Sequence, residues 1–66
     1  MTNEQIAQAT NGQLLARFKE LGCRLRGGNG FPPPASEFDA LQIAEEQDAI
    51  TAETERRIDR ALGITA

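Results

Sequence analysis

The sequence predicts an all-α fold, an antiparallel helical hairpin with a short additional helix at the N-terminus. Three observations support this: capping residues open three segments, apolar residues recur at helical spacing, and the stretch "GGNGFPPPA" separates the two longer segments. No segment shows the alternating pattern of a strand. The 66 residues are expected to form a single helical domain spanning 1–66.

The first two predicted helices each begin with a polar cap. Thr2, with Gln5 three residues later, forms a capping-box pattern and opens a short helix over about 3–9. The second helix, over about 11–26, begins near Thr10 with Gln13 in the matching position. Its apolar residues fall on one side and are expected to face the core: Leu14, Phe18, Leu21 and Leu25.

The loop 27–35 combines a bend with a spacer, and a long helix over about 36–62 follows it. Glycines end the second helix, three prolines extend the chain, and Ser36 caps the long helix. A break near Thr51 is an alternative, although no glycine or proline requires it. The long helix would measure about 40 Å against about 24 Å for its neighbour. The short helix would fold across the overhang, placing Ile6 against Ile58 and Leu62.

The long helix carries apolar residues on two sides. Ile43, Ile50, Ile58 and Ala61 form one stripe, whereas Phe38 and Leu41 lie on roughly the opposite side, which they share with Glu45 and Asp48. One hairpin cannot cover both sides. Three alternatives remain open for the second side: the Phe31 and proline loop packs over it, a second copy of the chain covers it, or it is open to a partner.

Self-association is also expected from the size of the chain. A domain of 66 residues buries a thin core and usually needs a disulfide, a metal or a second copy. One cysteine and no histidine leave neither a disulfide nor a zinc-type ligand cluster. We therefore expect a dimer or higher homo-oligomer, with no metal and no cofactor.

The charge distribution argues against nucleic acid as a partner. The formal net charge is −3, and nucleic-acid binding needs an excess of Lys and Arg. Seven acidic and no basic residues occur between Glu37 and Glu55, facing a second helix that contains Arg17, Lys19, Arg24 and Arg26. No apolar stretch approaches the length of a membrane span, and the N-terminus lacks signal-peptide features. A soluble, cytoplasmic protein is expected.

The sequence offers little for catalysis. Without histidine the familiar triads and metal-activated waters cannot be assembled, and Cys23 has no evident base, so we do not expect an enzyme. A weaker hypothesis is an anion site. The backbone N–H groups of the glycine loop and two neighbouring guanidinium groups could surround a small anion; the residues are Arg24, Arg26, Gly27, Gly28 and Asn29.

The leading functional expectation is a small interaction protein that binds an unidentified protein partner and modulates or inhibits it. By analogy of class, it would resemble the accessory regulators of phages and mobile elements. Phe31, Phe38 and Leu41 would be the apolar anchors, and Glu45 and Asp48 would set the orientation. One alternative is an oligomeric sponge for an anionic small ligand or nucleotide signal. A second is a structural subunit of a larger assembly.

Overall fold

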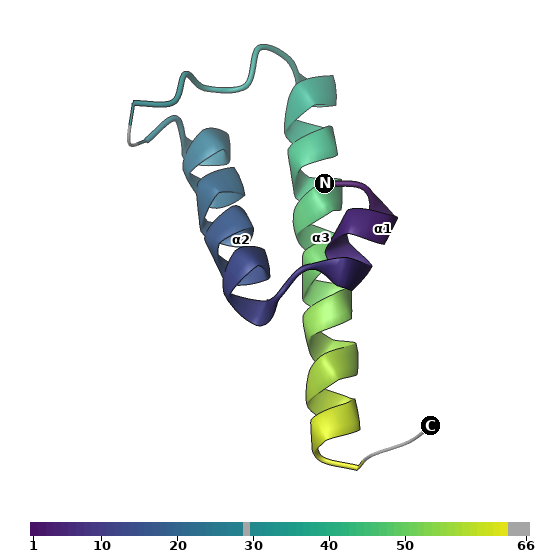
Figure 1. Ribbon diagram of the computed structural model, residues 1–66. Coiled ribbons are helices and arrows are strands. Elements are labelled where there is room, and N and C mark those ends of the chain that lie inside the picture. Colours follow the sequence, from purple (N-terminus) through teal and green to yellow (C-terminus); the bar gives the residue numbers. More distant parts are fainter. Residues whose placement is uncertain (29, 64–66) are drawn as a thin grey trace.

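The protein is all-helical in the part of the chain that the computed structural model describes, residues 1–28 and 30–63. It consists of α1 (Asn3–Gln8), α2 (Asn11–Arg26) and α3 (Glu37–Ala61), and no strand occurs in those two ranges. Figure 1 shows α2 and α3 side by side, with α1 against the middle of α3. α3 packs against both other helices, so it is the scaffold of the fold.

The two predicted capping boxes are both present and explain where α1 and α2 begin. The Thr2 hydroxyl accepts a hydrogen bond from the Gln5 N–H at 3.2 Å, and the Gln5 side chain accepts from the Thr2 N–H at 2.8 Å. Thr10 and Gln13 repeat the arrangement at 3.1 and 2.8 Å. Each box satisfies two N–H groups that a helix start would otherwise leave unpaired.

α2 ends at Gly27, which adopts a left-handed conformation with φ 70°. The Gly28 N–H donates to the Cys23 carbonyl at 2.9 Å and the Gly27 N–H donates to the Arg24 carbonyl at 3.3 Å. Pro33 lies against Gly27, where an added Cβ would approach it to 3.4 Å. The left-handed cap therefore turns the chain out of α2 and brings the proline run back against it.

α3 is one continuous helix, so the alternative of a break near Thr51 is wrong. Its start is capped by Ser36, whose hydroxyl accepts from the Asp39 N–H at 3.2 Å. Within the helix, the Thr54 hydroxyl donates to the Ile50 carbonyl at 2.9 Å. Thr54 thus satisfies its own hydroxyl without interrupting the helix.

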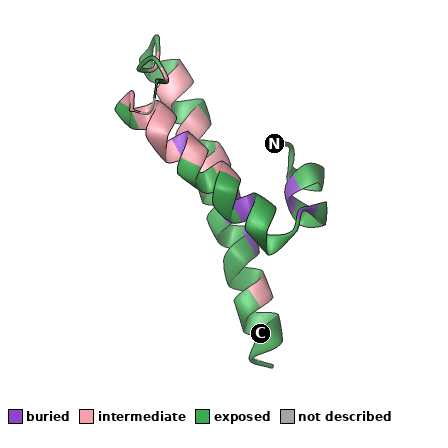
Figure 2. Cartoon of the chain, turned by 60° about the vertical axis from the view of Figure 1, so that its left-hand side comes forward, coloured by how far each residue is buried: buried purple, intermediate pink, exposed green. Residues whose placement is uncertain are grey.

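The core lies where the three helices meet. Five residues are buried there: Ile6, Ala9, Leu14, Leu21 and Ile50. Met1, Ile43 and Ala49 pack against them from the edge. Figure 2 shows the buried positions gathered at this junction, whereas the C-terminal end of α3 is almost entirely exposed.

The predicted packing of the α3 overhang is wrong. Ile6 belongs to the cluster around Ile50, while Ile58 and Leu62 are 52% and 68% exposed. The physical reason is the position of α1. Ile6 packs with Ile50, about two turns before Ile58, and α1 lies against the middle of α3, so the last turn of α3 projects beyond it. Phe18, predicted to face the core, is 38% exposed.

Candidate functional site

Phe38 and Leu41 form an exposed apolar pair on the first turns of α3. Their exposed fractions are 65% and 55%, large values for an aromatic and a branched aliphatic side chain. Helical spacing places Glu45 and Asp48 on the same side, and both are exposed. These four residues are called the Phe38–Leu41 surface below. Among the described residues, no ion pair involves either of its carboxylates.

The Phe31 and proline loop does not cover this surface. The Arg24 guanidinium lies over the Phe31 ring at 5.3 Å from its centroid, a cation–π contact that holds the ring against α2. A shallow cavity of about 300 Å³ beside it is bounded by the loop and both long helices: Arg24, Phe31, Pro32, Pro34 and Ile43. Phe31 therefore packs on Arg24, while Phe38 and Leu41 remain exposed on α3.

The predicted anion-binding residues are largely engaged within the chain. The Gly27 and Gly28 N–H groups donate to α2 carbonyls, and the Phe31 N–H donates to the Gly28 carbonyl at 3.1 Å. Arg24 pairs with Glu20 at 3.4 Å, while Arg26 is exposed. Asn29 lies outside the described residues. An anion could use the two glycine N–H groups only if the cap of α2 opened, and the anion site stays a prediction.

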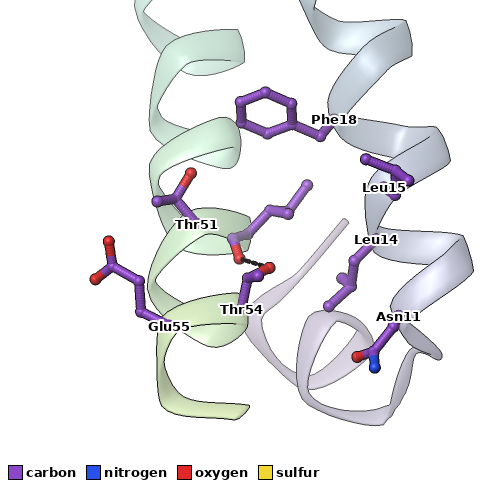
Figure 3. Close-up of a pocket in the computed structure, with 8 residues that line it drawn as sticks. Asn11, Leu14, Leu15, Phe18, Thr51, Thr54 and Glu55 are labelled. Carbon is purple, nitrogen blue, oxygen red and sulfur yellow. Dashed lines mark hydrogen bonds between the residues drawn. The ribbon is translucent and has the colours of Figure 1, made fainter. Parts of the chain in front are cut away.

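A groove between α2 and α3 is the feature that sequence reasoning missed. It has a volume of about 440 Å³, and Figure 3 shows it between the two helices, with Phe18 extending into it from α2 and Thr54 from α3. Its lining is Asn11, Leu14, Leu15, Phe18, Ile50, Thr51, Thr54 and Glu55. We call it the Leu15–Phe18 groove. Leu15 is 56% exposed, and Ile58 continues the apolar lining one turn beyond Thr54.

Two ionic clusters fix the helices on either side of the core. Arg17 on α2 forms a salt bridge with Glu46 on α3, and the Met1 amino group lies 2.9 Å from the same carboxylate. Near the other end, Arg57 bonds Glu53 at 2.8 Å and also donates to the Asn11 side chain at 2.8 Å. The sequence suggested that basic side chains of α2 oppose the acidic run of α3; of the four named, only Arg17 has an ion pair to α3 in the described part of the chain.

These contacts also shift the ionisation of the carboxyl groups. The hydrogen bond from Arg17 holds the pKa of Glu46 below its ordinary value, against the opposing effect of burial. Hydrogen bonds from Arg56 and Arg57 do the same for the pKa of Glu53. Both carboxylates are thus held in the charged form by hydrogen bonds from arginine side chains of the same chain. Their lowered pKa values therefore reflect contacts that stabilise the fold.

No cluster of three or more Asp, Glu or Cys side chains that could hold a metal ion occurs in residues 1–28 and 30–63. Over the same ranges, none of the helices combines the length and the apolar character that crossing a membrane requires.

Comparison of the chain with protein-family models, with curated proteins and with solved structures gave no significant match. The functional argument therefore depends on the surfaces themselves.

Proposed function

We infer that this protein is a small non-enzymatic interaction protein, which binds another protein through the Phe38–Leu41 surface and thereby modulates or inhibits it. The observation that carries the proposal is the exposure of Phe38 and Leu41, at 65% and 55%, on a helix whose other side packs on α1 and α2. Neither side chain contributes to the buried cluster. An exposed aromatic beside an aliphatic residue is typical of an interface anchor.

The chemistry of the surface indicates the kind of partner. Removing a Phe or a Leu side chain from water contributes about 1.5 to 3 kcal/mol when burial is complete. Glu45 and Asp48 continue the same side of α3 for two further turns and would meet basic side chains. The partner that fits is a protein with an apolar depression bordered by Lys or Arg, and the acidic pair would set the direction in which α3 lies on it.

The antiparallel hairpin and its assembly into a dimer or higher homo-oligomer belong to the same proposal. With α1 and α2 packed on one side of α3, the opposite side is the one left for a partner. Arg17 and Glu46 bond α2 to α3 at 2.6 Å and support the closed arrangement. In a multivalent assembly each copy would present one Phe38–Leu41 surface, which raises apparent affinity without adding contacts.

The test compares variants with matched exposure on different surfaces. Immobilised wild-type protein and the variants Phe38→Ala, Leu41→Glu and Leu15→Glu are used to capture partners, and each candidate is then purified and titrated against the same set. Leu15 and Leu41 are 56% and 55% exposed, so Leu15→Glu is the control for an added carboxylate.

The proposal expects the dissociation constant for the purified partner to rise at least about ten-fold with Phe38→Ala and Leu41→Glu, a change of about 1.4 kcal/mol. The Leu15→Glu control should bind the partner with the affinity of wild type per chain. A partner that binds all four proteins equally well would remove the Phe38–Leu41 surface from the account.

A further inference from the structure

We propose that the Leu15–Phe18 groove is the seam of a symmetric homodimer, occupied by the same groove of a second copy. This goes beyond the proposed function, because the groove lies between α2 and α3 and not on the outer side of α3. Its floor holds the buried Leu14 and Ile50, while Leu15 and Phe18 stand on its α2 wall at 56% and 38% exposure. A second copy would cover these two walls at once.

The charges along the two edges of the groove have opposite sign. On α2, Lys19 follows Leu15 by four residues and Arg26 lies further along the same outer edge, so this rim is basic. On α3, Glu55 lines the groove and the neighbouring exposed acids make that rim acidic; they are Asp48 and Asp59. None of these five side chains has an ion pair within residues 1–28 and 30–63.

Two grooves can face each other in two symmetric arrangements, and the opposite charges of the α2 and α3 rims favour one of them. A two-fold axis across the helices would place α2 on α2 and α3 on α3, so that like charges meet. A two-fold axis along the helices places α2 of each copy over α3 of the other, so that each basic rim meets an acidic rim. Like-charge contacts oppose association and complementary rims favour it, so the second arrangement is the one that the charges allow.

The internal contacts fix which residues meet. The Gln47 side chain donates to the Phe18 carbonyl at 3.3 Å, so Phe18 and Lys19 lie at the level of Gln47 and Asp48 along the molecule. Rotation about a two-fold axis along the helices does not change a residue's position in the direction of that axis. Lys19 therefore faces Asp48 of the second copy, and the two Phe18 rings meet at one level on either side of the axis.

Sedimentation equilibrium over a wide concentration range tests the dimer without any knowledge of the partner. Wild type is expected to approach twice the 7.2 kDa mass of one chain as concentration rises. Leu15→Glu places a carboxylate against the acidic rim and should raise the dimer dissociation constant at least about ten-fold. Phe38→Glu, which adds the same carboxylate on the side of α3 turned away from Glu55, should leave it unchanged. A chain that stays monomeric at all concentrations, or equal effects of the two variants, would overturn the proposal.

Charge reversal tests the orientation. Lys19→Glu and Asp48→Lys should each weaken the dimer, and the double variant should recover most of the wild-type affinity because the pair is restored with its signs exchanged. A double variant weaker than both single variants would exclude the axis along the helices. Both positions are exposed, so these variants also serve if circular dichroism shows that Leu15→Glu has lost its helices. A dimer weakened by Leu15→Glu or Lys19→Glu with intact partner binding separates this proposal from the function proposed above; Asp48→Lys is left out of that comparison, because Asp48 also belongs to the Phe38–Leu41 surface.

Discussion

Arg17 on α2 bonds Glu46 on α3 through two atoms of its guanidinium group, Nε to Oε2 at 2.6 Å and Nη2 to Oε1 at 3.3 Å. The paired geometry is the strongest form of a carboxylate–guanidinium contact. Arg17 also bonds Glu20 on its own helix at 2.7 Å. One side chain therefore joins the two long helices and is itself held in place by α2.

This contact predicts that acid weakens the fold. The pKa values of Glu46 and Glu53 lie below their ordinary value of 4.5 in the folded chain, owing to the hydrogen bonds from Arg17 and from Arg56 and Arg57. The unfolded chain therefore binds protons first as pH falls. The stabilisation is fully present above about pH 4.5 and is lost as pH falls through the lower folded pKa values. Urea unfolding at pH 7, 4.5 and 3 measures it.

Glu46→Gln supplies the control for the acid prediction. It removes one of the carboxylates whose pKa is lowered in the folded chain, and it should lower the free energy of unfolding at pH 7 by about 1 to 2 kcal/mol, because the hydrogen bond from Arg17 then has an uncharged acceptor. It should also flatten the dependence on pH. An unfolding free energy that is the same at pH 3 and pH 7 in wild type would contradict the assignment.

Arg57→Ala should destabilise the packing of α1. The Arg57 guanidinium donates to the Ile6 and Ala7 carbonyls at 3.3 and 3.2 Å and to the Asn11 side chain at 2.8 Å. Its removal should lower the free energy of unfolding by about 1 to 2 kcal/mol and speed amide exchange in α1. Arg60, exposed in the last turn, provides the control, and Arg60→Ala should change stability by less than about 0.5 kcal/mol. Equal effects would show that α1 does not depend on Arg57.

Ile50 and Ile58 form a matched pair that tests where the core ends. Ile50 is 2% exposed and Ile58 is 52% exposed on the same helix. Ile50→Ala should cost about 2 to 5 kcal/mol, a large part of the stability of so small a domain. Ile58→Ala should cost less than about 0.5 kcal/mol, measured at concentrations below dimer formation. Similar losses for the two variants would place Ile58 in the core and restore the packing predicted from the sequence.

Gly27→Ala should strain the end of α2. Gly27 has φ 70°, a left-handed conformation that residues with a Cβ adopt at a cost, so the expected loss is about 1 to 2 kcal/mol; the added Cβ itself would only touch Pro33, at 3.4 Å. Gly12 lies in the first turn of α2 with no atom within 4 Å of an added Cβ, and Gly12→Ala should be neutral or slightly stabilising. Thermal unfolding followed by circular dichroism measures both variants. A neutral Gly27→Ala would show that the left-handed cap is not required.

Much of the fold follows from local rules, and the tertiary arrangement does not. Thr2, Thr10 and Ser36 mark helix starts because capping is a contact over three residues, which a sequence displays directly. The placement of Ile58 failed because the apolar stripe of α3 continues past the point where α1 and α2 cease to cover it. That point is set by the position of α1 beside Ile50, a contact between distant parts of the chain that the sequence does not display.

The candidate surfaces also divide into features that helical periodicity predicts and features that only the tertiary structure decides. Periodicity placed Phe38 and Leu41 together on the side of α3 away from Ile50, and the structure shows both exposed. Phe31 is predicted as an anchor because it is an aromatic residue of the loop, but the sequence does not display its contact with Arg24 on α2. The groove was missed because Phe18 shares the apolar side of α2 with Leu14 and Leu21, which are buried. Which residues of that side are buried and which stay exposed depends on how α2 and α3 pack against each other.

The Phe31 and proline loop leaves the Phe38–Leu41 surface open, and partner binding through that surface depends on this. Nuclear Overhauser contacts in the monomeric Leu15→Glu variant test it most directly, because they report which side chains lie within a few ångströms of the Phe31 ring. The account predicts contacts from Phe31 to the Arg24 side chain and none from residues 31–34 to Phe38 or Leu41. Contacts between the proline loop and the Phe38 ring would show the surface covered and would contradict the account.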